Sequence, residues 1–450
     1  MPNSENVLQK SELPFDVENP DVSLVAGRAT LTFATKKMEG NGRVFLTMVP
    51  VPRWQFAFTP DGSRSGSEVL RDIIELQEVQ FAQLEFVGDD FTIDVSLETK
   101  SKVFSGSIEG TKGEEQVFCQ SISLAILNGP RTYPHRLIAK CSGHSITLEC
   151  REIGDKNISV FFATTHVAKI EFDAAVQKSD WDKAHTALFW TLSLMRGGWV
   201  GLVGSWVDVP DDPKRFPIPS VTKVTRPRKG RTWYLEQIDD AFAMLYPLVY
   251  SAIHESPHRE SLLTAMHWTV EANECAGGDI GSLVLQQSAL ECLAWQQLVV
   301  CRNYYSRNAF DRLSASEKLK LLCDEFKIET QIPVEFPELM DYASEEKVSG
   351  LLSILVRVRN SLVHAEPTKV RRLFERADGD DERSSLWHLM NGILQQAILA
   401  SLGYMGRFYD RVQPGTFSVE AIRDVPWKVG ERTPDTSDMQ DADFGINWLQ

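Results

Sequence analysis

The stretch SGLLSILVRVRNSLVHAEP, residues 349–367, decides the fold of the second half of the chain. Its apolar residues recur every three or four positions, which is the spacing of one buried stripe along an α-helix. The stripe consists of Leu351, Leu355, Val358 and Leu362. Proline stops a helix because it lacks a backbone donor and its ring clashes with the preceding turn. We therefore predict a helix from Ser349 to about His364, ended by Glu366 and Pro367.

Helical spacing continues on both sides of this stretch. Further helices are predicted to start near Glu260, to span Asp279 to Cys301, to run from Ser314 to Phe326, and to span Ser385 to Tyr409. Ser314 and Glu317 form a capping-box pattern, in which each side chain bonds the other residue's backbone amide. Residues 232–410 are therefore predicted to form an all-α bundle.

The N-terminal half has the period of two that is typical of β-strands. Apolar and polar residues alternate at 91–97, 146–150 and 170–172, and Gly/Asn/Asp turns separate such runs. We expect an antiparallel, sandwich-like or curved β-rich domain over residues 21–207, with a helix from Trp181 to Met195 near its end. No helices alternate with the strands, so the predicted fold class is α+β.

Three segments lie outside the two predicted domains. Residues 1–20 are expected to be a loose lead-in, and residues 411–450 an acidic tail that is partly disordered. Residues 208–231 carry five prolines and seven basic side chains. This composition favours a connection between domains, whose bases are either solvated or in contact with phosphates.

Composition narrows the classes of function. A formal net charge of −15 argues against a non-specific nucleic-acid coat or a polybasic membrane anchor. No apolar run reaches the roughly 18 residues of a membrane helix, so no membrane association is expected. The seven cysteines lack the close pairing of a zinc site, and they favour a reducing cytoplasm. We expect no metal and no cofactor.

Arg359, Asn360 and His364 form the constellation most suited to chemistry. Asn360 and His364 are four residues apart and share a helix face. His364 falls in the last helical turn, where exposed carbonyls favour its protonated form. A histidine can move protons, and a guanidinium can stabilise charge that develops on a phosphate. Alternatively, Arg359 forms a salt bridge with an acid and His364 only caps its helix.

The segment RNSLVH, residues 359–364, resembles the R-x(4–6)-H motif of HEPN domains, which are helical bundles found in many bacterial defence and toxin–antitoxin ribonucleases. The order of an upstream helix containing Ala289-Leu290-Glu291, the motif helix and a long closing helix also resembles that family, over residues 232–410. With a β-rich region in front, the chain looks most like antiphage HEPN proteins of the ApeA type.

The resemblance implies a metal-independent endoribonuclease in antiphage defence by abortive infection. Arg359 and His364 would be the catalytic pair and Asn360 their polar neighbour, with attack by the ribose 2′-hydroxyl on its own phosphate. Glu291 would be either a supporting carboxylate or a helix-packing acid. Such proteins usually form homodimers through the helical domain, and the β domain would sense a phage-derived or small-molecule trigger.

Three further features remain open at this point. Lys369, Arg371 and Arg372 follow the motif and form either an RNA-binding strip or a solvated helix face. Four tryptophans crowd the region between the predicted domains and either stack on bases or pack in the interior. They are Trp181, Trp190, Trp199 and Trp206. The alternative function is a non-catalytic protein that binds a ligand through the β domain and dimerises through the bundle.

Overall fold

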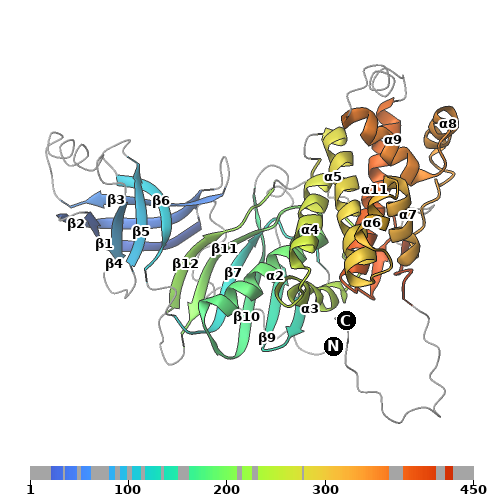
Figure 1. Ribbon diagram of the computed structural model, residues 1–450. Coiled ribbons are helices and arrows are strands. Elements are labelled where there is room, and N and C mark those ends of the chain that lie inside the picture. Colours follow the sequence, from blue (N-terminus) through green and yellow to red (C-terminus); the bar gives the residue numbers. More distant parts are fainter. Residues whose placement is uncertain are drawn as a thin grey trace, which may run out of the picture. The chain divides into compact units, whose positions relative to one another are not determined.

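The computed structural model describes fourteen stretches of the chain: residues 22–33, 36–47, 52–61, 81–86, 92–98, 104–112, 117–132, 136–150, 162–209, 215–225, 232–275, 278–363, 379–411 and 421–428. It combines an N-terminal antiparallel β-rich region with C-terminal helices (Figure 1). The chain divides into two compact units. One, here called the β unit, comprises Met1–Pro130, Pro134–Phe189 and Trp199–Arg228. The other, the helical unit, comprises Arg131–Tyr133, Trp190–Gly198 and Lys229–Gln450.

Six strands of the β unit close into an antiparallel barrel. In barrel order they are β1 (Val22–Phe33), β2 (Lys36–Thr47), β3 (Arg53–Pro60), β6 (Phe104–Thr111), β5 (Thr92–Glu98) and β4 (Phe81–Phe86). Alternate residues point inward, as the period of two requires, and Val44, Phe56 and Ile93 are fully buried. The strand predicted around Ile93 and Val95 is confirmed. A closed barrel replaces the expected sandwich-like or curved sheet.

The other six-stranded sheet of the β unit is open and antiparallel. Its order is β12 (Arg215–Val221), β11 (Gly201–Asp208), β7 (Cys119–Leu127), β10 (Thr164–Val176), β9 (His144–Cys150) and β8 (Arg136–Cys141). The predicted alternation in β9 and β10 is confirmed, because Ile146, Leu148 and Ile170 are buried. Helix α2 (Lys178–Arg196) follows β10 and ends at Gly197, whose φ of 71° is the left-handed conformation that suits a helix C-terminus.

The expected connection at residues 208–231 is corrected in its middle, because Arg215–Val221 is strand β12. This strand pairs with β11 and lies at the edge of the sheet. An edge strand tolerates Pro217 and Pro219 because one side of its backbone needs no partner strand. The prolines therefore indicated an edge rather than a break in the fold.

The helical unit contains most of the α-helices. They are α3 (Ala241–His254), α4 (Arg259–Asn273), α5 (Gly278–Trp295), the π-helix η2 (Gln296–Cys301), α6 (Arg307–Asp311), α7 (Ala315–Glu325), α8 (Pro337–Glu346), α9 (Leu351–Val363) and α11 (Gly379–Ser401). Helix α5 packs against α4, α7, α9 and α11 (Figure 1). The predicted capping box of α7 is confirmed, with both reciprocal bonds between Ser314 and Glu317 present. None of the described helices is long and apolar enough to cross a membrane.

One expectation for the helical unit needs correction. The closing helix ends at Ser401 rather than Tyr409, because Gly403 takes a φ of 75° and the chain continues as strand β13 (Arg407–Tyr409). This strand pairs with β14 (Ile422–Asp424). Pro337 occupies the first turn of α8, where its missing N–H costs nothing.

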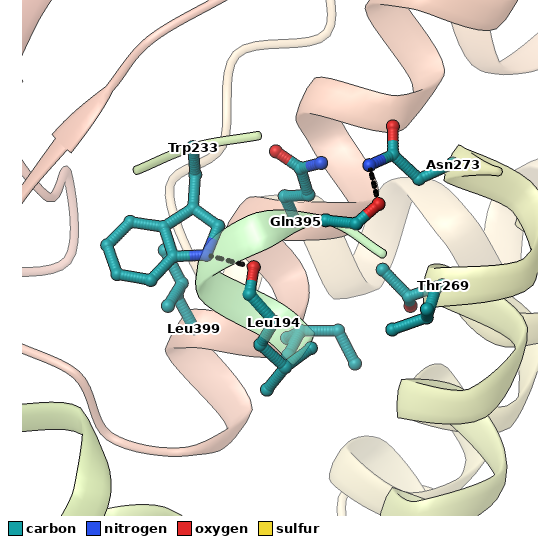
Figure 2. A pocket seen from close by; sticks show the side chains of 9 residues that line it. Leu194, Trp233, Thr269, Asn273, Gln395 and Leu399 are labelled. Carbon is teal, nitrogen blue, oxygen red and sulfur yellow. Dashed lines mark hydrogen bonds between the residues drawn. The ribbon is translucent and has the colours of Figure 1, made fainter. Parts of the chain in front are cut away.

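Buried amides join three helical segments of this unit. The Asn273 side chain donates to the carbonyl oxygen of Gly197 and accepts a bond of 2.8 Å from Asn391 Nδ2. Trp233 Nε1 donates to the Leu194 carbonyl at 3.2 Å. Figure 2 shows Asn273, Leu194 and Trp233 around a small cavity that Gln395 also lines. The end of α2 is therefore fixed to α4 and α11 by directional polar contacts.

We predict that Asn273→Ala lowers the free energy of unfolding by about 3 kcal/mol. The change leaves two buried groups, the Gly197 carbonyl and the Asn391 amide, without the bonds that Asn273 makes, and each lost partner costs about 1–3 kcal/mol. Urea denaturation followed by circular dichroism measures the effect. Asn308→Ala on the exposed surface of α6 is the control and should change it by less than about 0.5 kcal/mol. Equal stability of the two variants would contradict the role of this network.

Candidate functional site

Helix α9 carries the predicted motif on a well-packed scaffold. It contacts α5, α7, α8 and α11. Leu351, Leu355 and Val358 of the predicted stripe are buried, whereas Leu362 is only half-buried. Ile354 and Ser361 extend the buried face, and the Ser361 hydroxyl donates to the Arg357 carbonyl at 2.9 Å. The backbone that presents Arg359 and Asn360 is therefore fixed by burial along the helix.

The two arginines of this helix have different surroundings. Arg357 donates from Nε and Nη2 to Glu346 Oε2 on α8, at 3.1 and 3.0 Å. Arg359 has no carboxylate partner among the residues that the structure describes, so the alternative of a salt bridge gains no support there. Instead, Arg359 Nη1 donates to Asn360 Oδ1 at 3.1 Å. The structure thus brings these two predicted site residues together.

The Nε atom of Arg359 is buried and has no hydrogen-bond partner in the described part of the chain. Leaving a buried donor unpaired costs about 1–3 kcal/mol, and such groups are rare in folded proteins. An arginine that is retained without an acidic partner is available for an anion such as a phosphate. Among the described residues, the Arg359 guanidinium is thus paired with Asn360 through Nη1, while its Nε has no partner.

Glu291 lies on α5 and accepts a hydrogen bond of 2.6 Å from Gln287 Nε2, one turn earlier on the same helix. Neither a hydrogen bond nor an ion pair joins Glu291 to Arg359 or Asn360, all three of which are described. This contact fits the helix-packing acid better than the supporting carboxylate.

Four predicted site residues lie outside the described residues. They are His364, Lys369, Arg371 and Arg372. Helix α9 is described up to Val363, which directly precedes His364 in the sequence. The roles predicted for these four side chains stay predictions.

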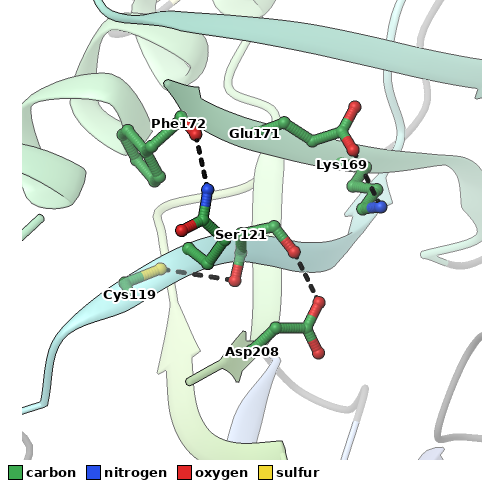
Figure 3. Close-up of polar contacts among 7 residues, drawn as sticks. Cys119, Ser121, Lys169, Glu171, Phe172 and Asp208 are labelled. Carbon is green, nitrogen blue, oxygen red and sulfur yellow. Dashed lines mark hydrogen bonds and ion pairs between the residues drawn. The ribbon is translucent and has the colours of Figure 1, made fainter. Parts of the chain in front are cut away.

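Polar groups of the open sheet form a second cluster, on β7, β10 and β11. The Ser121 hydroxyl donates to Asp208, and Lys169 Nζ lies 2.9 Å from Glu171 Oε1 (Figure 3). Burial, and then the negative charge of Asp208, raise the pKa of the Cys119 thiol to about 12. Because the thiolate is the reactive form, Cys119 is not a nucleophile at neutral pH. No group of three or more potential metal ligands occurs within the stretches described above.

The tryptophans are interior side chains in three of four cases. Trp181, Trp199 and Trp206 are buried, and Trp190 is half-buried. The ring of Trp199 stacks on Phe189 with centroids 5.5 Å apart. Packing therefore accounts for these tryptophans better than base stacking does.

Residues 302–312, RNYYSRNAFDR, were not expected to be functional. Only Arg307–Asp311 is helical, as α6, so periodicity does not single the segment out. The sequence pattern that could have indicated a function is the occurrence of arginines close to tyrosines and asparagines.

We predict opposite effects on stability for the two arginines of α9. Arg357→Met removes the ion pair with Glu346 and should lower the free energy of unfolding by about 1 kcal/mol, because the pair is partly exposed. Arg359→Met removes a buried donor that has no partner in the described part of the chain, and should leave that free energy unchanged or raise it. Urea denaturation measures the free energy of unfolding of both variants. A larger loss of stability in Arg359→Met would mean that Arg359 is structural.

Comparisons with known proteins give a family match over part of the chain and a relative over most of its length. Residues 255–422 match the family model described as the YopA C-terminal domain, and this range includes α9. The chain is 24% identical over 465 residues to the SPbeta prophage-derived uncharacterized protein YopA of Bacillus subtilis (strain 168), with 94% of this chain and 99% of that protein covered. No solved structure matches the chain. The chain is thus similar to a prophage-derived protein over nearly its whole length.

Proposed function

We propose that the protein is a metal-independent endoribonuclease of the HEPN type. The observation that carries the proposal is Arg359. It lies five residues before His364 on a helix with one buried face, has no acidic partner among the described residues, and donates a hydrogen bond to Asn360. The packing of α5 against α9 and α11 supports the same proposal, because the resemblance implies that order of helices.

In the proposed reaction the ribose 2′-hydroxyl attacks the adjacent phosphorus. A bond forms between O2′ and phosphorus, the bond from phosphorus to O5′ breaks, and the products are a 2′,3′-cyclic phosphate and a 5′-hydroxyl. His364 moves a proton from the 2′-hydroxyl or to the leaving O5′. The Arg359 guanidinium stabilises the charge on the pentavalent phosphate. Asn360 orients this guanidinium by accepting the hydrogen bond from Nη1.

The proposed setting is antiphage defence in the cytoplasm. Two copies would join through their helical units and bring two motifs together, while the β unit would respond to a phage-derived or small-molecule trigger. Similarity to a prophage-derived protein supports a setting in which phages and their hosts compete. The reaction requires no metal ion and no cofactor.

We predict that the purified protein cleaves RNA in the presence of EDTA and leaves 2′,3′-cyclic phosphate ends. Arg359→Lys should lower the rate at least about 100-fold, because a point charge does not replace the two-pronged contact of a guanidinium with phosphate. His364→Ala should abolish cleavage. A substrate with 2′-deoxyribose at the cleaved position should remain intact, since it lacks the attacking group. Gel electrophoresis with end analysis measures all three results.

The matched control is Arg357→Lys, on the same helix and two residues away, which should keep the wild-type rate. Equal rates for wild type, Arg359→Lys and His364→Ala would remove both residues from the mechanism. The absence of cleavage by wild type, together with loss of dimers in Arg359→Ala, would favour the alternative of a non-catalytic ligand-binding and dimerising protein. Light scattering measures the dimer.

A further inference from the structure

The exposed segment after the π-helix combines arginine with an outward aromatic ring. Tyr304 is 59% exposed, more than any other aromatic side chain in the described residues. Its backbone is nevertheless fixed, because the Tyr304 amide donates to the Leu298 carbonyl at 2.9 Å. Asn303 makes the turn that permits this bond, with a φ of 52° in the left-handed region that asparagine tolerates. The ring is therefore presented to solvent from a rigid position.

Cationic side chains surround this ring in the sequence. Residues 302–320 contain five lysines and arginines but two acids, although the whole chain carries a net charge of −15. Arg302, Arg307 and Arg312 are exposed. Lys318 Nζ lies 4.9 Å from the centre of the Phe310 ring, which holds this cation of α7 next to α6. The segment therefore has an excess of basic residues within an acidic protein.

The ion pair of Arg307 does not prevent it from binding phosphate. Arg307 Nε lies 3.9 Å from Asp311 Oδ2, and both side chains are more than half exposed. Arg302 Nε lies 3.1 Å from Glu325 Oε1, with the arginine side chain 43% exposed. The Glu325 side chain is only 20% exposed, so the argument applies to Arg307: an exposed pair contributes little to stability, and its guanidinium can turn to another anion at low cost.

We propose that residues 302–320, here called the basic-aromatic surface, bind single-stranded RNA. The arginines would contact the backbone phosphates, and an unpaired base would stack on Tyr304. A duplex is a poorer fit, because its bases are already stacked on one another. This inference rests on the proposed function for the identity of the ligand as RNA, and adds that the RNA is single-stranded and held by residues apart from the motif.

The test is fluorescence anisotropy of the full-length protein with a labelled single strand of 2′-O-methyl RNA. Such a strand cannot be cleaved, and about 12 nucleotides is within the usual site size for single-strand binding. Tyr304→Ala should raise the Kd about tenfold or more through loss of stacking, whereas Tyr304→Phe should keep it. Arg307→Gln should reduce the slope of log Kd against log salt by about 0.7, which is the loss of one phosphate contact.

Matched controls exist elsewhere on the surface. Phe118→Ala removes another exposed aromatic ring, and Arg259→Gln removes another arginine in an exposed ion pair. Both should bind as wild type does. An unchanged Kd in Tyr304→Ala would overturn the inference, as would equal affinity for a duplex or for an acidic peptide of the same charge.

The two proposals fail in different ways. Cleavage by wild type with no change of RNA affinity in Tyr304→Ala would leave the ribonuclease standing and remove the basic-aromatic surface. Binding that depends on Tyr304, without any cleavage, would do the reverse. Circular dichroism of each variant establishes that a change in Kd does not come from loss of the fold.

Discussion

The helical unit depends on the burial of α5. This helix packs against four others, and its side chains Leu283, Leu290 and Leu293 are within 1% of complete burial. The faces of α5 that meet these helices also bury polar side chains, namely Ser282, Gln286 and Gln287. Gln286 Nε2 donates to the Trp387 carbonyl on α11 at 3.1 Å, which fixes the register between these two helices. The position of α9, and with it that of Arg359, follows from this packing.

Where a local signal determined the structure, the sequence was sufficient. The capping box at Ser314 and Glu317 and the alternation around Ile93 are short-range patterns, and both occur in the structure. Non-local contacts were the main source of error. The closing helix was predicted to run to Tyr409, but Phe408 pairs with Arg423 in a strand that lies after a gap in the described part of the chain. Strand β12 was missed for the same reason. It is held by its pairing with β11, whereas its prolines had suggested a connection without regular structure.

The positions of the candidate site residues could be predicted from the sequence, but their contacts with other helices could not. Arg359 and Asn360 are adjacent in sequence, so their contact needs no knowledge of the fold. Which of the two arginines of α9 is paired could not be predicted, since Glu346 belongs to α8, a helix that the pattern did not indicate. Among the described residues, Arg357 is thus paired with a carboxylate of another helix and Arg359 with the amide of its own neighbour.

The prolines of β12 also affect whether a strand of another chain can add to this edge of the sheet. An edge strand exposes unpaired backbone groups, to which a strand of another chain can add, and this is a common start of aggregation. Pro217 and Pro219 lack the N–H group that such an added strand would need, and they are two residues apart on the outermost strand of the sheet. At the opposite edge β8 is six residues long and carries Arg136 and Lys140. Both edges therefore discourage the sheet from growing by the addition of a strand.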